Sequence, residues 1–152
     1  MCSSDLTRIS HRNTGKLLDK AGYEVMAKVA ADENRHHLFY RDLVDAALDV
    51  DPSRMIIAIE RQVRDFQMPG TGIEGFITHA HVIARAGIYD LSIHHDQILV
   101  PVVLRHWRIE SRTGLTPEAE RARDQLLTRI RRLERAGKRL ARHREQPVAA
   151  AG

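Results

Sequence analysis

Residues 24–48 read EVMAKVAADENRHHLFYRDLVDAAL, and the fold can be inferred from this stretch. Its large apolar side chains at helical spacing are Val25, Val29, Phe39, Leu43 and Leu48. This spacing predicts one long helix with a largely apolar face, on which Asp42 and Asp45 would instead face water. Glu33 and His36 are three residues apart in the same stretch. At about 100° per residue they lie roughly 60° apart, on one face of the helix.

The Glu-x-x-His spacing has a known chemical use. In di-iron carboxylate bundles, one helix supplies a carboxylate and an imidazole at this spacing to a metal held between helices. The chain contains nine histidines, and a composition of this kind produces roughly 0.5 such pairs by chance. The motif alone therefore does not distinguish a metal site from an accidental pair, and the two interpretations are about equally supported.

The remainder of the chain also has helical patterns and shows no internal repeat. The expected helices cover residues 7–18, a segment from Pro52 that stops before Pro69, 73–85, 91–107 and 117–142. Pro52 and Pro117 are expected at first helical positions, the latter with Thr116 as the cap. Gly87 should break a helix, and Pro101 should kink or divide one. The β-branched cluster around Pro101 could also form a buried strand, but the flanking segments offer no partner strand.

Composition restricts the class of protein. An apolar share of 43% with 29% charged residues is typical of a soluble globular domain, and the 152 residues suffice for one domain with a core. No apolar run approaches the length of a membrane span, and the first residues lack a secretory pattern. Cys2 is the single cysteine, so no internal disulfide is possible and a cytoplasmic location is expected.

The formal net charge of +4 is unevenly distributed, because most of the excess lies between Arg121 and Arg144. This basic stretch could be a solvated helix face, balanced in part by neighbouring acidic residues. It could also contact an acidic protein, such as an acyl carrier protein. Nucleic acid is less favoured, since the stretch lacks aromatic residues for base stacking.

Several separated blocks, in a fixed order, resemble one family. They are Arg8–Thr14, Asp32–His36, Phe39–Val44, Gln67–Pro69, Ala86–Tyr89, His106–Arg108, Thr113–Thr116 and Arg129–Arg135. Together they resemble the C-terminal half of the soluble acyl-carrier-protein desaturases, the stearoyl-type di-iron enzymes. The resemblance extends over roughly residues 7 to 140.

This resemblance implies an all-α, ferritin-like helical bundle, truncated to its C-terminal half. The intact enzyme would be an oxidoreductase of fatty acid metabolism that inserts a double bond into an acyl chain, using O2 and two iron ions. Its expected partners are an acyl carrier protein bearing the acyl chain and a ferredoxin-type electron donor, and it would be a homodimer. We expect this chain alone to be inactive. Acyl chain length and double-bond position are not specified by the sequence.

The resemblance also implies roles for four residues. Glu33 and His36 match metal ligands, namely the second Glu-x-x-His pair of the family. Asp32 matches a residue that orients the histidine of the other half through its far ring nitrogen. Thr7 aligns with a threonine on the O2 side of the iron pair, where it would assist proton delivery. An ordinary helix threonine and a solvated carboxylate remain the alternatives for Thr7 and Asp32.

The chain departs from the family at its start. The isolated ligand carboxylate of this half would fall at position 4, where the chain has Ser4. Residues 2–6 can be back-translated as the end of a common sequencing adapter, so residues 1–6 are expected to be a non-native leader. Residues 7–145 would then form a single helical domain, and residues 146–152 a disordered tail.

Other polar residues are poor replacements for the missing ligands. Glu60 has Arg61 and Arg64 as helical neighbours, which favours a surface role. The histidine pairs at 79/81 and 94/95 point to different sides of their helices, and core or surface roles are favoured. The rival to the desaturase hypothesis is a basic helical interaction module that binds an acidic protein or nucleic acid without metal.

Overall fold

The computed structural model describes residues 3–68 and 70–145, and in this part of the chain every regular element is a helix. In chain order these are α1 (Ser3–Gly15), α2 (Lys20–Val50), α3 (Pro52–Arg64), α4 (Phe76–Arg85), α5 (Leu91–His94), the π-helix η1 (His95–His106), the 3-10 turn η2 (Ile109–Ser111) and α6 (Pro117–Glu145). The prediction of an all-α fold is therefore confirmed. A loop was expected at Pro69 and a disordered tail at residues 146–152. Both segments lie outside the described residues.

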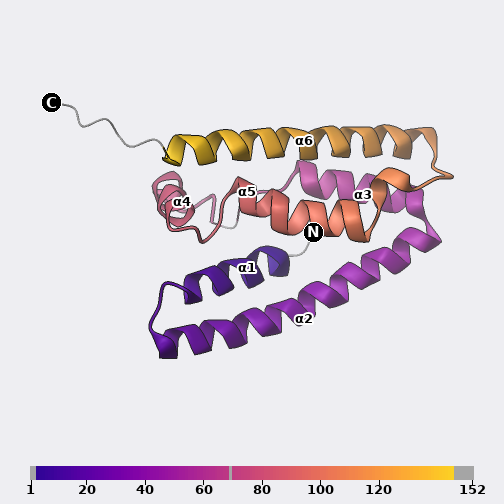
Figure 1. The fold of residues 1–152 in the computed structure, drawn as a ribbon. Coiled ribbons are helices and arrows are strands. Elements are labelled where there is room, and N and C mark those ends of the chain that lie inside the picture. The colour runs from indigo at the N-terminus through magenta and orange to yellow at the C-terminus, as the bar shows by residue number, and fades with distance from the viewer. Residues whose placement is uncertain (1–2, 69, 146–152) are drawn as a thin grey trace.

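The helices form two packed groups (Figure 1). Helix α1 folds back along α2 as an antiparallel pair, while α6 lies across α3, α5 and η1. The main core fills the second group and includes the fully buried side chains of Ile56, Leu99, Val103 and Leu126. Leu48, near the end of α2, joins this core and so connects the two groups.

Helix α2 is longer than the predicted segment 24–48, because Asp19 caps it. The Asp19 carboxylate accepts a hydrogen bond from the Gly22 backbone N–H at 2.8 Å, which satisfies a donor in the first turn. Of the five apolar residues expected on one face, Leu48 alone is buried, whereas Phe39 is 63% exposed and Leu43 54% exposed. Apart from α1, few described residues cover this helix.

Helix α1 begins at Ser3, four residues before the predicted start. Leu6, which belongs to the segment expected to be a foreign leader, is only 8% exposed and packs with Ile9, Tyr89 and Ile98. Residues 4–6 are therefore buried in the fold, and the origin of residues 1–6 as a non-native leader stays a prediction. Asp5 is also buried, and its carboxylate pairs with the imidazole of His37 on α2.

Two predicted helix starts are confirmed. Pro52 occupies the first turn of α3, and Asp51 accepts a hydrogen bond from the Arg54 N–H at 3.0 Å. Helix α6 begins at Pro117, where the Thr116 hydroxyl accepts from the Ala119 N–H at 3.3 Å. Gly87, at φ +69°, follows the end of α4 as predicted, since this left-handed conformation suits a residue without Cβ.

The segment containing Pro101 is helical but of an unexpected type. An α-helical turn from Leu91 passes into a π-helix at His95, and Pro101 lies inside it. Proline lacks an N–H, and in an α-helix its ring clashes with the carbonyl four residues earlier. The π register, in which an N–H bonds the carbonyl five residues earlier, is seen in the bond from the Trp107 N–H to the Val102 carbonyl at 2.9 Å.

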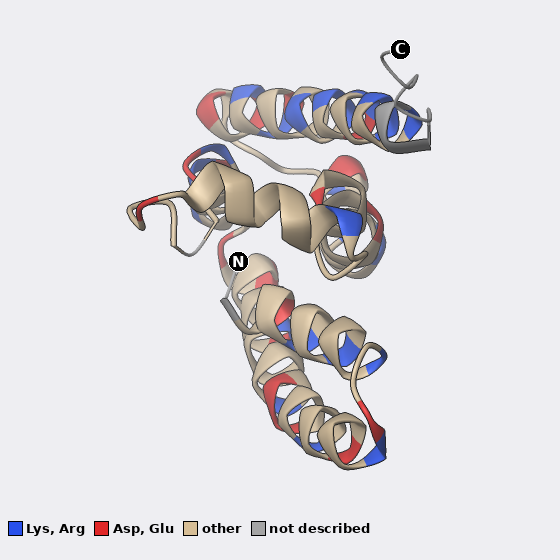
Figure 2. Cartoon of the chain, turned by 90° about the vertical axis from the view of Figure 1, so that its left-hand side faces the viewer, with Lys and Arg blue, Asp and Glu red and all other residues tan. Residues whose placement is uncertain are grey.

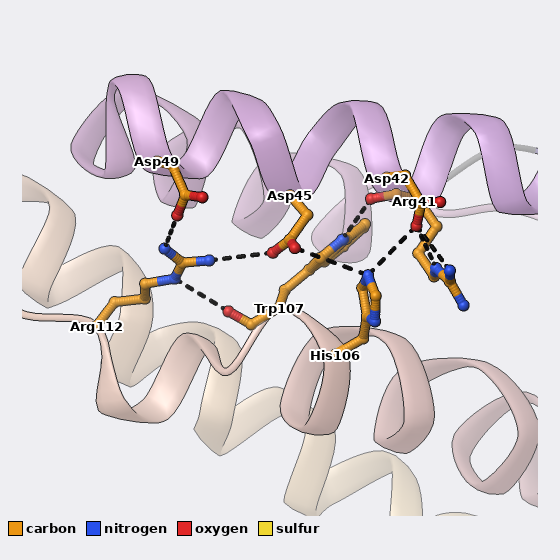
Figure 3. A network of polar contacts seen from close by, with 7 residues as sticks. All are labelled: Arg41, Asp42, Asp45, Asp49, His106, Trp107 and Arg112. Carbon is orange, nitrogen blue, oxygen red and sulfur yellow. Dashed lines mark hydrogen bonds and ion pairs between the residues drawn. The ribbon is translucent and has the colours of Figure 1, made fainter.

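A polar network joins α2 to the end of η1 and the turn that follows (Figure 3). Trp107 donates its indole N–H to the Arg41 carbonyl at 2.9 Å. Arg112 donates to the carboxylates of Asp49 at 2.6 Å and Asp45 at 3.1 Å. The prediction that Asp45 faces water is therefore wrong, because the folded chain brings a guanidinium from a distant turn against it.

Helix α6 carries its charge on the side away from the core, and Figure 2 shows Lys and Arg recurring along it. Its contact with α5 depends on Gly137, where an added Cβ would lie 2.8 Å from the Ser92 hydroxyl and 3.1 Å from the Ser92 backbone nitrogen. No helix among the described residues is long and apolar enough to cross a membrane.

The close approach at Gly137 gives a test of this packing. Alanine normally stabilises an exposed helix relative to glycine. Here we expect Gly137→Ala to lower the free energy of unfolding by about 2 kcal/mol, because the new methyl group meets backbone atoms of Ser92. Urea denaturation followed by circular dichroism would measure it. A more stable variant would show that α6 does not contact α5 as described.

Candidate metal-ligand pair on α2

The α1–α2 hairpin determines where Glu33 lies. Gly15 is buried at the closed end of the hairpin, and a Cβ there would lie 3.0 Å from the Met26 Cβ, so its absence lets the helices approach closely. The two helices run antiparallel from this point. The start of α1, with Ser4 and Thr7, therefore lies opposite the middle of α2.

Glu33 faces α1. Its side chain is 26% exposed, and it accepts hydrogen bonds from the hydroxyl groups of Ser4 and Thr7. The Ser4 hydrogen bond is the main cause that lowers the pKa of the Glu33 carboxyl; the Thr7 bond and His36 act in the same direction, and partial burial opposes them. Glu33 is therefore held as a carboxylate, the form in which it could bind a cation.

His36 lies one turn further along α2. Its Nδ1 is 3.6 Å from a carboxylate oxygen of Glu33, and its side chain is 64% exposed. The two predicted ligands therefore lie side by side, with Glu33 turned toward α1 and His36 largely open to solvent. Thr7, the third predicted site residue, is brought to the same place by its bond to Glu33.

Asp32 is not brought into this group. Its carboxylate forms an ion pair with Arg35 at 2.6 Å, and both side chains are well exposed. The neighbouring His37 is instead buried against Asp5. No local pattern indicates this Asp5–His37 pair, and Asp5 lies in the segment expected to be a leader.

The remaining candidate ligands lie elsewhere. His94 and His95 are buried in the core, whereas His79 and His81 are exposed on α4. The prediction of a surface role for Glu60 is wrong: Glu60 is only 4% exposed, and Arg64 donates to its carboxylate at 2.8 Å. Glu60 and Arg64 line a cleft together with residues of α6.

Among the described residues, no three His, Cys, Asp or Glu side chains gather where they could hold a metal ion. Glu33 and His36 provide one carboxylate and one imidazole, fewer donors than a protein metal site requires. Taken alone, these residues do not fit a two-iron centre.

Comparison with known proteins identifies the family. The family model described as "Fatty acid desaturase" matches residues 5–151. The chain belongs to the fatty acid desaturase family. The matched range contains most of α1, all of α2 with the Glu33–His36 pair, and the rest of the chain through α6.

Individual desaturases agree with this match. The chain is 45% identical over 131 residues to DesA1 of Mycobacterium tuberculosis, which carries the name of an acyl-(acyl-carrier-protein) desaturase, with 86% of this chain and 38% of that protein covered. It is 36% identical to stearoyl-(acyl-carrier-protein) 9-desaturase 4 of Arabidopsis thaliana, covering 90% of this chain and 37% of the relative. The corresponding protein of Solanum tuberosum is 32% identical, with 91% and 38% covered.

The chain therefore spans a little over a third of the length of the curated desaturases it matches. The family relationship supports the reading of this chain as a desaturase, and no relative named here favours a metal-free interaction module. The incomplete set of metal ligands is consistent with this partial coverage, because most of a desaturase's length has no counterpart in this chain.

Proposed function

We propose that this chain is the C-terminal part of an acyl-carrier-protein desaturase, which introduces a double bond into a saturated acyl chain with O2 and electrons from a donor protein. The observation that carries the proposal is the placement of Glu33, ionised and turned toward Ser4 and Thr7 on α1, with His36 one turn away. Within a member of the desaturase family, this pair would be one side of a metal clamp built between helices.

The chain's own residues would act by holding and orienting. Glu33 and His36 would supply two of the six ligands of a pair of iron ions, which in the intact enzyme activate O2. The hydroxyl groups of Ser4 and Thr7 bond the Glu33 carboxylate, and Thr7 would pass a proton beside it. Asp32 would orient the histidine of the other half once its bond to Arg35 opens.

The partners follow from the same proposal. An acyl carrier protein would present the acyl chain, a ferredoxin-type protein would supply electrons, and the complete enzyme would be a homodimer in the cytoplasm. The names of the relatives support the carrier protein as the form in which the substrate arrives.

A chimera tests the activity directly. Residues 7–145 would replace the corresponding segment of the Arabidopsis stearoyl desaturase, whose own sequence then supplies position 4 and everything before it. We expect the purified chimera to convert stearoyl-carrier protein to a monounsaturated product, measured by mass spectrometry of the released fatty acids. Glu33→Ala and His36→Ala in the chimera should abolish the product, because each removes a metal ligand.

Glu24→Ala is the matched control, since Glu24 is an exposed carboxylate on the same helix, and it should leave turnover unchanged. A chimera with the parent's melting temperature and metal content but no product would contradict the proposal. So would equal activity in the Glu33→Ala and Glu24→Ala proteins.

A second prediction concerns Ser4 in the 152-residue chain. Ser4→Glu places a carboxylate where the resemblance expects a ligand, beside Glu33, and so creates a set of three donors. Without metal, two adjacent carboxylates should lower the melting temperature. Added Co²⁺ should restore it and give a visible absorption band, because a ligand that binds only the folded state stabilises it.

Ser10→Glu, on the same helix, is the control for an added charge alone. If both variants respond equally to Co²⁺, position 4 does not face the Glu33–His36 pair as a ligand would.

A further inference from the structure

A cleft with a volume of about 370 Å³ lies between α1 and α2. Arg8 and Arg12 line it from α1, and Tyr23, Ala27 and Asn34 line it from α2. None of the residues that line it carries a carboxylate. The cleft therefore combines two positive charges, polar hydrogen-bond donors and a small apolar wall.

The two guanidinium groups are not neutralised within the described part of the chain. Neither has a carboxylate within 4 Å, and Asp5, one turn before Arg8, is engaged by His37. Arg8 makes one long contact, from Nη2 to the Gln97 carbonyl at 3.5 Å. Its Nε is buried without a hydrogen-bond partner, a state that is uncommon for a charged donor in a folded protein.

The electrostatics agree with this geometry. Burial is the main cause that lowers the pKa of the Arg8 guanidinium, and the positive charges of Arg12 and Arg41 lower it further, although Asp5 opposes them. Two like charges that share one cleft repel each other. A bound anion would relieve this repulsion.

The neutral donors restrict the kind of anion. The carboxamide of Asn34 is half buried at the cleft and forms no side-chain hydrogen bond with the described residues, and the Tyr23 side chain reaches the same cleft. The two guanidinium groups carry ten N–H donors in fixed forks, of which one on Arg8 is directed at the Gln97 carbonyl. A phosphate group, with three terminal oxygens, can accept from both forks and the amide at once, which exceeds the capacity of one planar carboxylate.

We propose that this cleft binds the phosphate group of an organic phosphate ester, held by Arg8, Arg12 and Asn34. The volume is several times that of a phosphate ion, so the organic part would lie along Ala27 and the Ile9 side chain. The proposal goes beyond the desaturase reaction and does not depend on iron, so the two can fail separately.

Titration calorimetry on the 152-residue chain tests the site. Inorganic phosphate and glycerol 3-phosphate would be the probes, at an ionic strength held constant with NaCl. We expect saturable binding of both, tighter for the ester because it also contacts the apolar wall. Arg12→Gln should weaken binding by about 10-fold or more, because it removes a charge-assisted hydrogen bond. Arg12 is exposed, so this variant should still fold.

Arg131→Gln, another exposed helical arginine, is the matched control and should bind phosphate as the parent does. Asn34→Asp, which introduces a negative charge into the cleft, should weaken binding at least as much as Arg12→Gln. Heat that does not saturate, or equal affinities in the Arg12→Gln and Arg131→Gln proteins, would overturn the proposal. Equal affinity for the two probes would overturn the placement of an organic group on the apolar wall.

Discussion

Replacing Trp107 with alanine is expected to lower the free energy of unfolding by about 4 kcal/mol, the usual range for removing a large buried aromatic residue. Trp107 is 3% exposed in the main core. It directly follows η1 and contacts α2, because its indole N–H donates to the Arg41 carbonyl at 2.9 Å. The substitution therefore removes both packing and an interhelical hydrogen bond.

Trp107→Phe separates the two contributions. Phenylalanine retains most of the apolar contact but has no N–H, so the loss should be only about 1 kcal/mol beyond any repacking. Urea denaturation followed by circular dichroism is the suitable measurement, since Trp107 is the single tryptophan and the variants lack its fluorescence. Ile77→Ala, at a 72% exposed position on α4, should change stability little. A loss below about 1 kcal/mol in Trp107→Ala would mean that this contact does not anchor α2 to the core.

Local patterns predicted the helices well where a capping side chain or a proline marks an end. Asp51–Pro52 and Thr116–Pro117 are such places, because cap chemistry is decided within four residues. The π-helix around Pro101 was not predicted, since its hydrogen-bond register depends on how η1 packs between neighbouring helices. The ion pairs of Arg112 with Asp45 and Asp49 join residues more than sixty positions apart. No periodicity could indicate them.

The candidate site was predicted only in part, because spacing within one helix can be inferred from the sequence and contacts between helices cannot. The spacing of Glu33 and His36 is a local property of one helix, and the structure keeps them together. The contact of Glu33 with Ser4 and Thr7 depends on how α1 folds back on α2. The residue-by-residue likeness to a family supplied Thr7, but composition and periodicity could not. The Asp5–His37 pair joins two helices across 32 positions, so no local pattern indicates it.

The second large effect concerns acid. His94 is 3% exposed, stacked on the Phe66 ring at 4.6 Å between centroids, and its Nδ1 accepts a hydrogen bond from the Tyr89 hydroxyl at 2.7 Å. Burial is the main cause that lowers the pKa of His94 to about 4, and the nearby His95 acts in the same direction, while Asp5 opposes them. The same burial raises the pKa of Tyr89, so its hydroxyl stays protonated as the donor.

Because the folded state holds His94 neutral, the unfolded chain binds more protons between its ordinary pKa near 6.5 and about 4. The free energy of unfolding should therefore fall as the pH falls through this window, by about 3 kcal/mol in total from this residue. Above pH 6.5 the contribution is fully present. Urea denaturation at a series of pH values would measure the slope.

His94→Gln isolates this contribution from that of the other histidines. Glutamine has no proton to gain, and its amide oxygen can still accept from the Tyr89 hydroxyl. The difference in unfolding free energy between parent and variant should shrink as the pH falls from 6.5 to 4, because the parent alone pays the protonation penalty at this position. A constant difference across that range would show that His94 titrates normally. The stacking on Phe66 and the bond to Tyr89 would then not exclude water as the structure indicates.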